Sequence, residues 1–268
     1  MFATPAYAQA AGGGAAGGIA GFIHDEDGDH FELKAPDLNH ILKQAMIAKN
    51  HEMPFAFVSA RQLGQYEIEQ FEITSNIFDG PMFFNVAKET GVAEAEKFQT
   101  DGHFLITNHT IFTSPLTLSF KKNIDIFVQC VAQRIPVMLV TQPFSGQNGP
   151  MTPYGIALLA FAEFLAGMAM AFAINPDTKI INGAYPTMCT PGRNPQLKIG
   201  SMVHNFTNYL IAYTSRLLDI ASIQSGCTIE GQVHKQELLE TDYQTVRAMI
   251  LWEDIFTGWH MVRHCYGF

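Results

Sequence analysis

Amide and aromatic side chains follow the short apolar runs of this sequence. Amide groups donate and accept hydrogen bonds, and aromatic faces attract cations, so such a set can bind a small polar molecule. The residues at these positions that we select as site candidates are Asn108, Gln142, Phe144, Tyr185, Gln224, His264 and Tyr266.

Several familiar catalytic patterns are missing from the sequence. No lysine follows an apolar run as a Schiff-base candidate, and there is no G-x-S-x-G elbow, Walker loop or H-E-x-x-H motif. Cys227, His264 and Cys265 could bind zinc together, although buried cysteines more often serve as small core residues. His264 is equally typical of a hydrogen-bonded core histidine.

Gly146 and Gly149 lie in the loop after Gln142. They could mark a phosphate cradle, but the loop lacks the partners that such a cradle uses. We therefore predict a tight turn that lets the backbone approach a ligand.

The apolar runs predict the strands that must position these residues. The runs are apolar throughout and alternate with helical patterns, as in parallel strands covered by helices. They predict most of a (β/α)8 TIM-type barrel, incomplete at its ends, with its site at the carboxyl ends of the strands. The runs are residues 55–58, 82–86, 104–107, 137–140, 179–181, 219–223 and 260–262, with residues 19–23 as a candidate eighth strand.

Helical spacing is clearest in three segments. Apolar residues recur over residues 38–46, and again over residues 120–131 after a candidate N-cap at Ser119. Residues 156–174 are long and apolar enough for a membrane span. Because they carry Glu163 and lack aromatic or basic anchors, we predict a buried core helix. A buried carboxylate is costly, so Glu163 must be paired or lie near the site.

The composition favours one cytoplasmic domain. The chain has 268 residues, of which 47% are hydrophobic, so we predict a single domain over residues 19–268 after a flexible lead-in of residues 1–18. The net charge of −9 without a basic run disfavours nucleic acid and membrane partners. The four cysteines are widely spaced, so we expect reduced thiols.

Several motifs, in order, resemble the trimethylamine methyltransferase superfamily. The clearest are PFSGQNGPMT at residues 143–152, AEFLAG at residues 162–167, and NP at residues 175–176 before IING at residues 180–183. The likeness covers roughly residue 18 to the end of the chain. It includes Asn108, residues 114–116, residues 225–226, residues 242–244, Trp252, His264 and Gly267.

The resemblance implies a TIM barrel that moves a methyl group from a tertiary or quaternary methylated amine to the cobalt of a separate corrinoid protein. No pyrrolysine is present, so the resemblance points to the branch that acts on quaternary amines such as glycine betaine, or to a member of unknown substrate. It differs by lacking much of the family's N-terminal region and by stopping at Phe268, which indicates a truncated member. The chain itself would bind no cofactor, because the corrinoid (cobalamin) is supplied by the partner protein.

The resemblance also gives the candidate residues substrate-binding roles. Aromatic faces would hold the ammonium group, and amides would orient a polar end of the substrate. Each of these residues could instead serve ordinary packing or loop hydrogen bonding. The cage candidates are Phe144, Tyr185, Tyr266 and Tyr154; the amides are Asn108, Gln142 and Gln224; Glu230 would balance positive charge.

Two other functions fit the same sequence. A truncated barrel could be noncatalytic or an assembly subunit, with a homo-oligomer among its possible states. A lyase or isomerase of the same fold would use His264 as its base.

Overall fold

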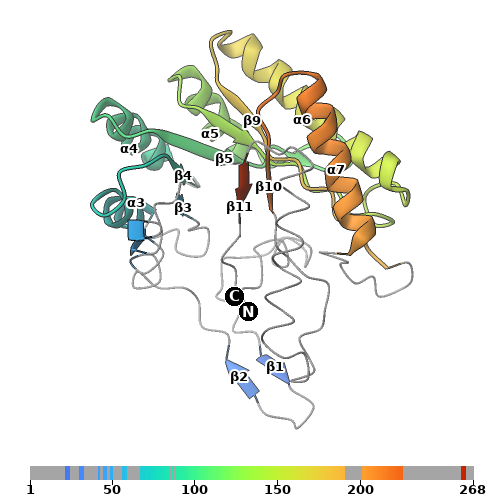
Figure 1. The fold of residues 1–268 in the computed structure, drawn as a ribbon. Coiled ribbons are helices and arrows are strands. Elements are labelled where there is room, and N and C mark those ends of the chain that lie inside the picture. Colours follow the sequence, from blue (N-terminus) through green and yellow to red (C-terminus); the bar gives the residue numbers. More distant parts are fainter. Residues whose placement is uncertain are drawn as a thin grey trace. The chain divides into compact units, whose positions relative to one another are not determined.

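The computed structural model of this chain describes residues 22–24, 30–32, 42, 45–46, 49–50, 56–58, 67–84, 86, 89–190, 201–225 and 261–263 (Figure 1). The chain divides into two compact units. One comprises residues 1–105, 232–236 and 268, and the other comprises residues 106–231 and 237–267. The predicted lead-in, residues 1–18, lies outside the described residues, and a single domain stays a prediction.

The first unit contains a hairpin and a parallel strand pair. Strands β1 (Phe22–His24) and β2 (His30–Glu32) pair antiparallel, and β3 (Ala56–Val58) pairs parallel with β4 (Met82–Phe84). The prediction that residues 19–23 supply an eighth parallel strand is therefore wrong. Two strands separated by a short turn pair locally, as in any hairpin.

Two helices of the first unit pack around phenylalanine rings. They are α3 (Glu67–Ser75) and α4 (Glu89–Thr100). The Phe71 ring of α3 lies 5.5 Å from the Phe84 ring of β4 and 3.8 Å from the Phe98 ring of α4, measured between centroids. Phe71 is buried and anchors both helices to the strand.

The second unit is built on parallel strands. Strand β8 (Val137–Leu139) pairs parallel with β5 (Leu105–His109) on one side and with β9 (Ile180–Asn182) on the other. A small antiparallel hairpin of β6 (Phe112–Thr113) and β7 (Thr117–Leu118) follows β5. Strand β10 (Ile223–Ser225) pairs parallel with β11 (Met261–Arg263).

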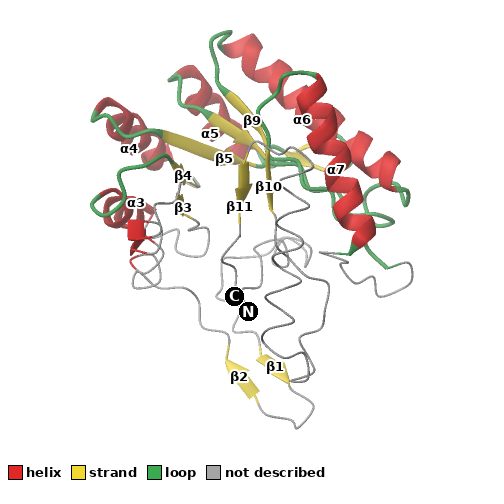
Figure 2. Cartoon of the chain, viewed as in Figure 1, coloured by secondary structure: helices red, strands yellow, loops and turns green. Residues whose placement is uncertain are grey.

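Three helices lie on one side of these strands: α5 (Lys121–Ala132), α6 (Pro153–Ile174) and α7 (Met202–Leu217). Figure 2 shows them in red beside the yellow strands β5, β9 and β10. The parallel pairing and the helical cover confirm the predicted α/β class. Among the described strands, closure into a barrel is not shown.

Two element boundaries differ from the sequence prediction. Strand β10 starts at Ile223 rather than at residue 219, because Asp219 has φ 56° and ends α7 in the left-handed conformation. The N-cap of α5 is Phe120 rather than Ser119, and its side chain makes no capping hydrogen bond. The Ser119 hydroxyl accepts a hydrogen bond from the Asn123 side chain instead.

Helix α6 has the length and composition of a membrane span, yet its inner face packs within the unit. Its N-cap is Thr152, whose hydroxyl accepts a hydrogen bond from the Gly155 amide at 3.1 Å. Ala160 and Phe164 are fully buried, and the helix contacts β8, α5 and α7. The prediction of a core helix is confirmed for this face, whereas Leu158 lies on an exposed outer face.

Gly167 allows α6 to approach the sheet closely. A Cβ atom at this position would lie 2.9 Å from Leu139 Cδ1 and 3.1 Å from Ile111 Cδ1. We predict that Gly167→Leu lowers the free energy of unfolding by about 2 kcal/mol or more through overpacking. Urea denaturation measures this loss. The matched change Ala169→Leu, at an exposed position of the same helix, should cost far less, and equal losses would contradict the close packing.

Candidate functional site

The backbone pairing of β8 and β9 continues beyond the ends of both strands. The amides of Gly183, Tyr185 and Thr187 donate to the carbonyls of Leu139, Thr141 and Pro143, at 2.9, 2.8 and 2.9 Å respectively. This ladder keeps the two loop segments side by side. It brings the backbones of Gln142, Phe144 and Tyr185 to one edge of the second unit.

Asn108 and Gln142 face away from the helices. Their neighbours face the helices: the His109 ring packs 5.5 Å from the Phe127 ring of α5, and the Thr141 hydroxyl donates to the Ala160 carbonyl of α6 at 2.9 Å. Because successive side chains of an extended chain alternate, Asn108 and Gln142 point to the opposite face. Asn108 lies within β5 opposite Met138 of β8, whereas Gln142 follows β8 and lies four residues beyond that level.

Gln142 also contacts the neighbouring segment. Its Nε2 atom lies 3.5 Å from Thr187 Oγ1, at the limit of a hydrogen bond, while its side chain is half-buried. The amide is therefore loosely held and able to turn toward a ligand.

The loop after Gln142 forms a tight turn, as predicted. The Phe144 amide donates to Asn148 Oδ1 at 2.6 Å, and the Gly146 amide donates to the Gly149 carbonyl at 2.9 Å. Gly146 has φ 69°, a conformation that favours glycine. The turn sets the backbone of Phe144 against Thr187, to which it is bridged.

Cys189 fastens this turn to the segment after β9. Its amide donates to Ser145 Oγ at 2.7 Å, and Gln147 Nε2 lies 3.4 Å from its sulfur atom. Burial raises the pKa of the Cys189 thiol, while the hydrogen bonds lower it to a smaller extent. Cys189 and Cys130 are both buried and form no disulfide, and reduced thiols stay a prediction.

A buried polar cluster joins Tyr185 to α7. His204 Nε2 lies 3.1 Å from the Tyr185 hydroxyl and 3.1 Å from Asn208 Nδ2, and the Tyr185 and His204 rings meet edge to face at 5.1 Å. Burial lowers the pKa of His204 to about 4, so its imidazole is neutral at pH 7. According to the imidazole tautomer, Nε2 either accepts one of these hydrogen bonds or donates to the Tyr185 hydroxyl.

The sequence reasoning missed this cluster. His204 and Asn208 are spaced four residues apart, on the same face of α7 as the buried Ile211 and Ser215. That spacing was the available signal. It shows which residues share a helix face, but it does not show that the face meets Tyr185.

Glu163 is paired inside the fold, as predicted. Ser114 Oγ donates to Glu163 Oε2 at 2.8 Å, and the Leu116 amide donates to Glu163 Oε1 at 2.9 Å. Desolvation raises the pKa of this carboxyl, and the two hydrogen bonds lower it less. Glu163 thus holds the hairpin that follows β5 in place.

Several predicted site residues are not tested by the structure. Tyr154 is 66% exposed and meets the Phe206 ring of α7, with centroids 5.6 Å apart. Among the described residues, no group of His, Cys, Asp and Glu could hold a metal ion. The side chain of Gln224, together with Glu230, His264, Tyr266, Cys227 and Cys265, lies outside the described part of the chain.

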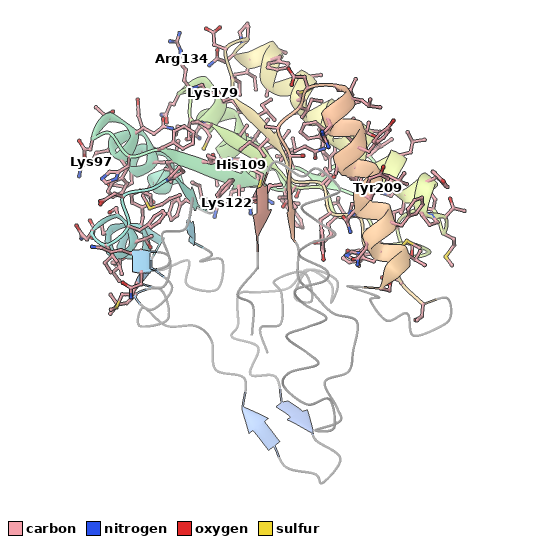
Figure 3. All side chains as sticks on the ribbon, in the orientation of Figure 1. Lys97, His109, Lys122, Arg134, Lys179 and Tyr209 are labelled. Atoms are coloured by element: carbon pink, nitrogen blue, oxygen red, sulfur yellow. The ribbon has the colours of Figure 1, made fainter. Side chains whose placement is uncertain are left out.

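Basic residues lie toward the other ends of the strands. Arg134 and Lys179 are exposed and come just before β8 and β9 in the sequence; Figure 3 labels both near the top of the view. Arg134 and Lys179 thus lie at the amino ends of β8 and β9, whereas Lys121 and Lys122 begin α5, which follows β5 and its hairpin. Asn108, Gln142 and Tyr185, at the carboxyl ends, are neutral.

Comparison with known proteins identifies the family. Residues 86–268 match the family model described as trimethylamine methyltransferase (MTTB). The chain belongs to this family. No curated protein matches it.

Solved structures show the same fold in dihydropteroate synthases, which are TIM-barrel-like. The enzyme from Coxiella burnetii, in complex with pteroic acid, has a TM-score of 0.56 at 12% identity, covering 90% of this chain and 91% of that chain. The Yersinia pestis enzyme, in a sulfonamide drug complex, has a TM-score of 0.53 at 13% identity, covering 84% and 79%. The Vibrio fischeri ES114 enzyme has a TM-score of 0.51 at 14% identity, covering 85% and 82%. At these identities the likeness concerns the fold alone.

Glu163 should make stability fall as the pH rises. The folded-state pKa is raised above its ordinary value of 4.5, so the folded protein holds this proton more tightly than the unfolded chain. We expect the free energy of unfolding to decrease between pH 4.5 and that raised pKa, and Glu163→Gln to remove this decrease. Urea denaturation at several pH values measures it.

Glu163→Ala is the contrasting variant. This change removes the carboxylate that accepts hydrogen bonds from Ser114 Oγ and the Leu116 amide, and it leaves a cavity. We expect the free energy of unfolding at pH 7 to fall by about 2 to 4 kcal/mol. Glu163→Gln keeps an acceptor for Leu116 and should be close to wild type. Equal losses for both variants would contradict the hydrogen-bonding role.

His204 should produce the opposite slope. Between pH 6.5 and about 4 the unfolded chain binds a proton at this histidine while the folded protein does not. Stability is therefore lost as the pH falls through this range, by up to about 3 kcal/mol, and His204→Gln should flatten that part of the curve. Thermal or urea unfolding against pH checks this, and an unchanged slope in the variant would contradict a buried neutral imidazole.

Proposed function

We propose that the chain transfers a methyl group from a methylated amine to the cobalt of a corrinoid held by a separate protein. The observation that carries the proposal is the family match over residues 86–268. We also propose that the strands complete a (β/α)8 barrel with the site at its mouth, which the likeness to the dihydropteroate synthases supports.

The neutral side chains of Asn108, Gln142, Phe144 and Tyr185 suit a quaternary ammonium substrate. The carbon–nitrogen bond breaks and its electron pair stays on nitrogen, so the departing amine is neutral and needs no proton. The partner's corrinoid, in its cobalt(I) state, would supply both electrons of the new cobalt–carbon bond and so become methylcobalt(III). The protein therefore has to bind the cation and aim one methyl group, which calls for positioning groups rather than a general acid.

The described residues can supply such positioning. Gln142, which follows β8, could orient a polar end of the substrate, and Asn108 presents an amide on the same face deeper along β5. The backbones of Phe144 and Tyr185 are held at the same edge by the extended β8–β9 ladder, and the half-buried Phe144 ring could contribute about 0.5 to 2 kcal/mol toward binding a cation, whereas the Tyr185 ring is buried against His204. The hydrogen bond to His204 fixes the Tyr185 ring before substrate arrives.

Other residues keep the roles that the family resemblance gives them. Gln224 would orient the substrate with Asn108 and Gln142, Glu230 would balance positive charge, and His264 and Tyr266 would complete the binding site. We further propose a cytoplasmic location, in keeping with the wide spacing of the four cysteines in the sequence.

The direct test is a methyl-transfer assay. The protein is incubated with reduced cobalamin and a panel of tertiary and quaternary methylated amines, including trimethylamine and glycine betaine, and the absorbance of methylcobalamin is followed. We expect one amine to be demethylated. Failure across the panel, with folded protein and both free cobalamin and corrinoid protein as acceptors, would contradict the proposal.

Gln142 gives a specific prediction within that assay. Gln142→Ala removes one hydrogen bond to the substrate and should reduce kcat/KM by about 10-fold. The matched control Gln133→Ala changes an exposed glutamine at the end of α5 and should keep wild-type kcat/KM. Equal rates for the two variants would remove Gln142 from the site.

A further inference from the structure

An exposed apolar stripe runs along α7. It comprises Val203, Phe206, Leu210, Tyr213 and Leu217, which recur at alternating spacings of three and four residues. Leu217 is 67% exposed, and all members except the half-buried Leu210 are exposed. This is the heptad spacing with which one helix packs along another.

The opposite face of α7 is buried within the second unit. His204, Asn208, Ile211 and Ser215 are buried, and Ser215 Oγ accepts a hydrogen bond from Asn182 Nδ2 of β9 at 3.0 Å. The apolar stripe is therefore not the face that attaches α7 to its own sheet. Its spacing calls for a second helix on the outer side.

The start of α6 extends this surface. Tyr154 and Leu158 are 66% and 72% exposed, and Tyr154 meets Phe206 of α7. Along α7, the Tyr209 ring lies between those of Phe206 and Tyr213, with centroid distances of 6.4 and 5.9 Å, and Figure 3 labels Tyr209 on this helix. We define the α6–α7 apolar face as Tyr154, Leu158, Val203, Phe206, Leu210, Tyr213 and Leu217.

We propose that the α6–α7 apolar face binds the same face of a second copy of this chain. Its size fits such a contact: a stable interface buries roughly 800 Å² on each partner, and large aromatic side chains contribute roughly 150 to 250 Å² each when fully buried. Tyr154, Phe206 and Tyr213 are 66%, 38% and 49% exposed, so each can bury part of that area, and Leu158 and Leu217 at 72% and 67% exposure add to it.

Charge also favours a second copy. The chain carries a net charge of −9, so two copies repel each other through most surfaces. The only charged residue of α6 is Glu163, which is buried, and α7 has Arg216 as its only lysine, arginine, aspartate or glutamate. Two copies can thus meet here without bringing acidic groups together.

A lipid surface fits these observations less well. Helices that lie on membranes usually carry lysine and arginine on the face beside the apolar one, and those positive charges attract anionic headgroups. Arg216 alone does not provide such a face, and the net charge is negative.

Two identical faces that bind each other are related by symmetry. Such a pair has a two-fold axis, so the two α7 helices run antiparallel. Leu210, at the centre of the stripe, then lies opposite its own copy, and Val203 lies opposite Leu217 of the other copy.

The first test is the mass of the full-length protein in solution, measured by sedimentation velocity over a concentration series. We expect a dimer. Leu158→Glu and Tyr213→Glu should each weaken association by about 100-fold or more, because each places a carboxylate in a desolvated contact. Phe120→Glu is the matched control at an equally exposed residue, 76% accessible before α5, and should leave the dimer intact. Unchanged circular dichroism shows that the variants are folded.

The second test is cross-linking. Leu210→Cys should form a disulfide-linked dimer under mild oxidation faster than wild type, whereas Leu217→Cys should not, since in an antiparallel pair it faces Val203. Faster cross-linking of Leu217→Cys would overturn the proposed geometry. A wild-type monomer at every concentration, dimers that survive both glutamate variants, or a monomer that floats with phosphatidylcholine and phosphatidylserine vesicles would each overturn the proposal.

Discussion

The parallel backbone pairing of β8 with β9, extended past both strands, is the constraint on which the candidate site depends. Three successive amide-to-carbonyl hydrogen bonds, from Gly183, Tyr185 and Thr187, hold the loop after β8 beside the loop after β9. Without this ladder, Gln142 and Phe144 would lie on a free loop. With it, their positions are set by main-chain geometry, which tolerates changes in the side chains themselves.

Buried polar groups then connect these strands to their helices. Asn182 is hydrogen-bonded to Ser215 of α7, Thr141 to the Ala160 carbonyl of α6, and Tyr185 to His204. An unpaired polar group in such a place would cost about 1 to 3 kcal/mol, so each pair favours one arrangement of helix on strand. Hydrophobic packing alone would tolerate small shifts of α7, whereas these pairs would not.

The family match and the likeness of fold give different kinds of information about this chain. Membership of the trimethylamine methyltransferase family concerns most of the chain and directs attention to methyl transfer. The likeness to dihydropteroate synthases concerns the architecture, at identities of 12 to 14%. Substrate, acceptor and oligomeric contact therefore depend on side chains at the strand ends and on the outer faces of α6 and α7, and neither comparison specifies those.

The sequence by itself determined the α/β class, the places of the parallel strands, the tight turn at Gly146 and the need for Glu163 to be paired. These follow from local patterns: apolar runs, glycine conformation and the cost of burying a charge. Tertiary structure alone decided that residues 22–24 pair antiparallel, that Tyr185 meets His204, and that α7 leaves one apolar face uncovered. Each of these depends on which segments meet, and spacing along a chain does not encode that.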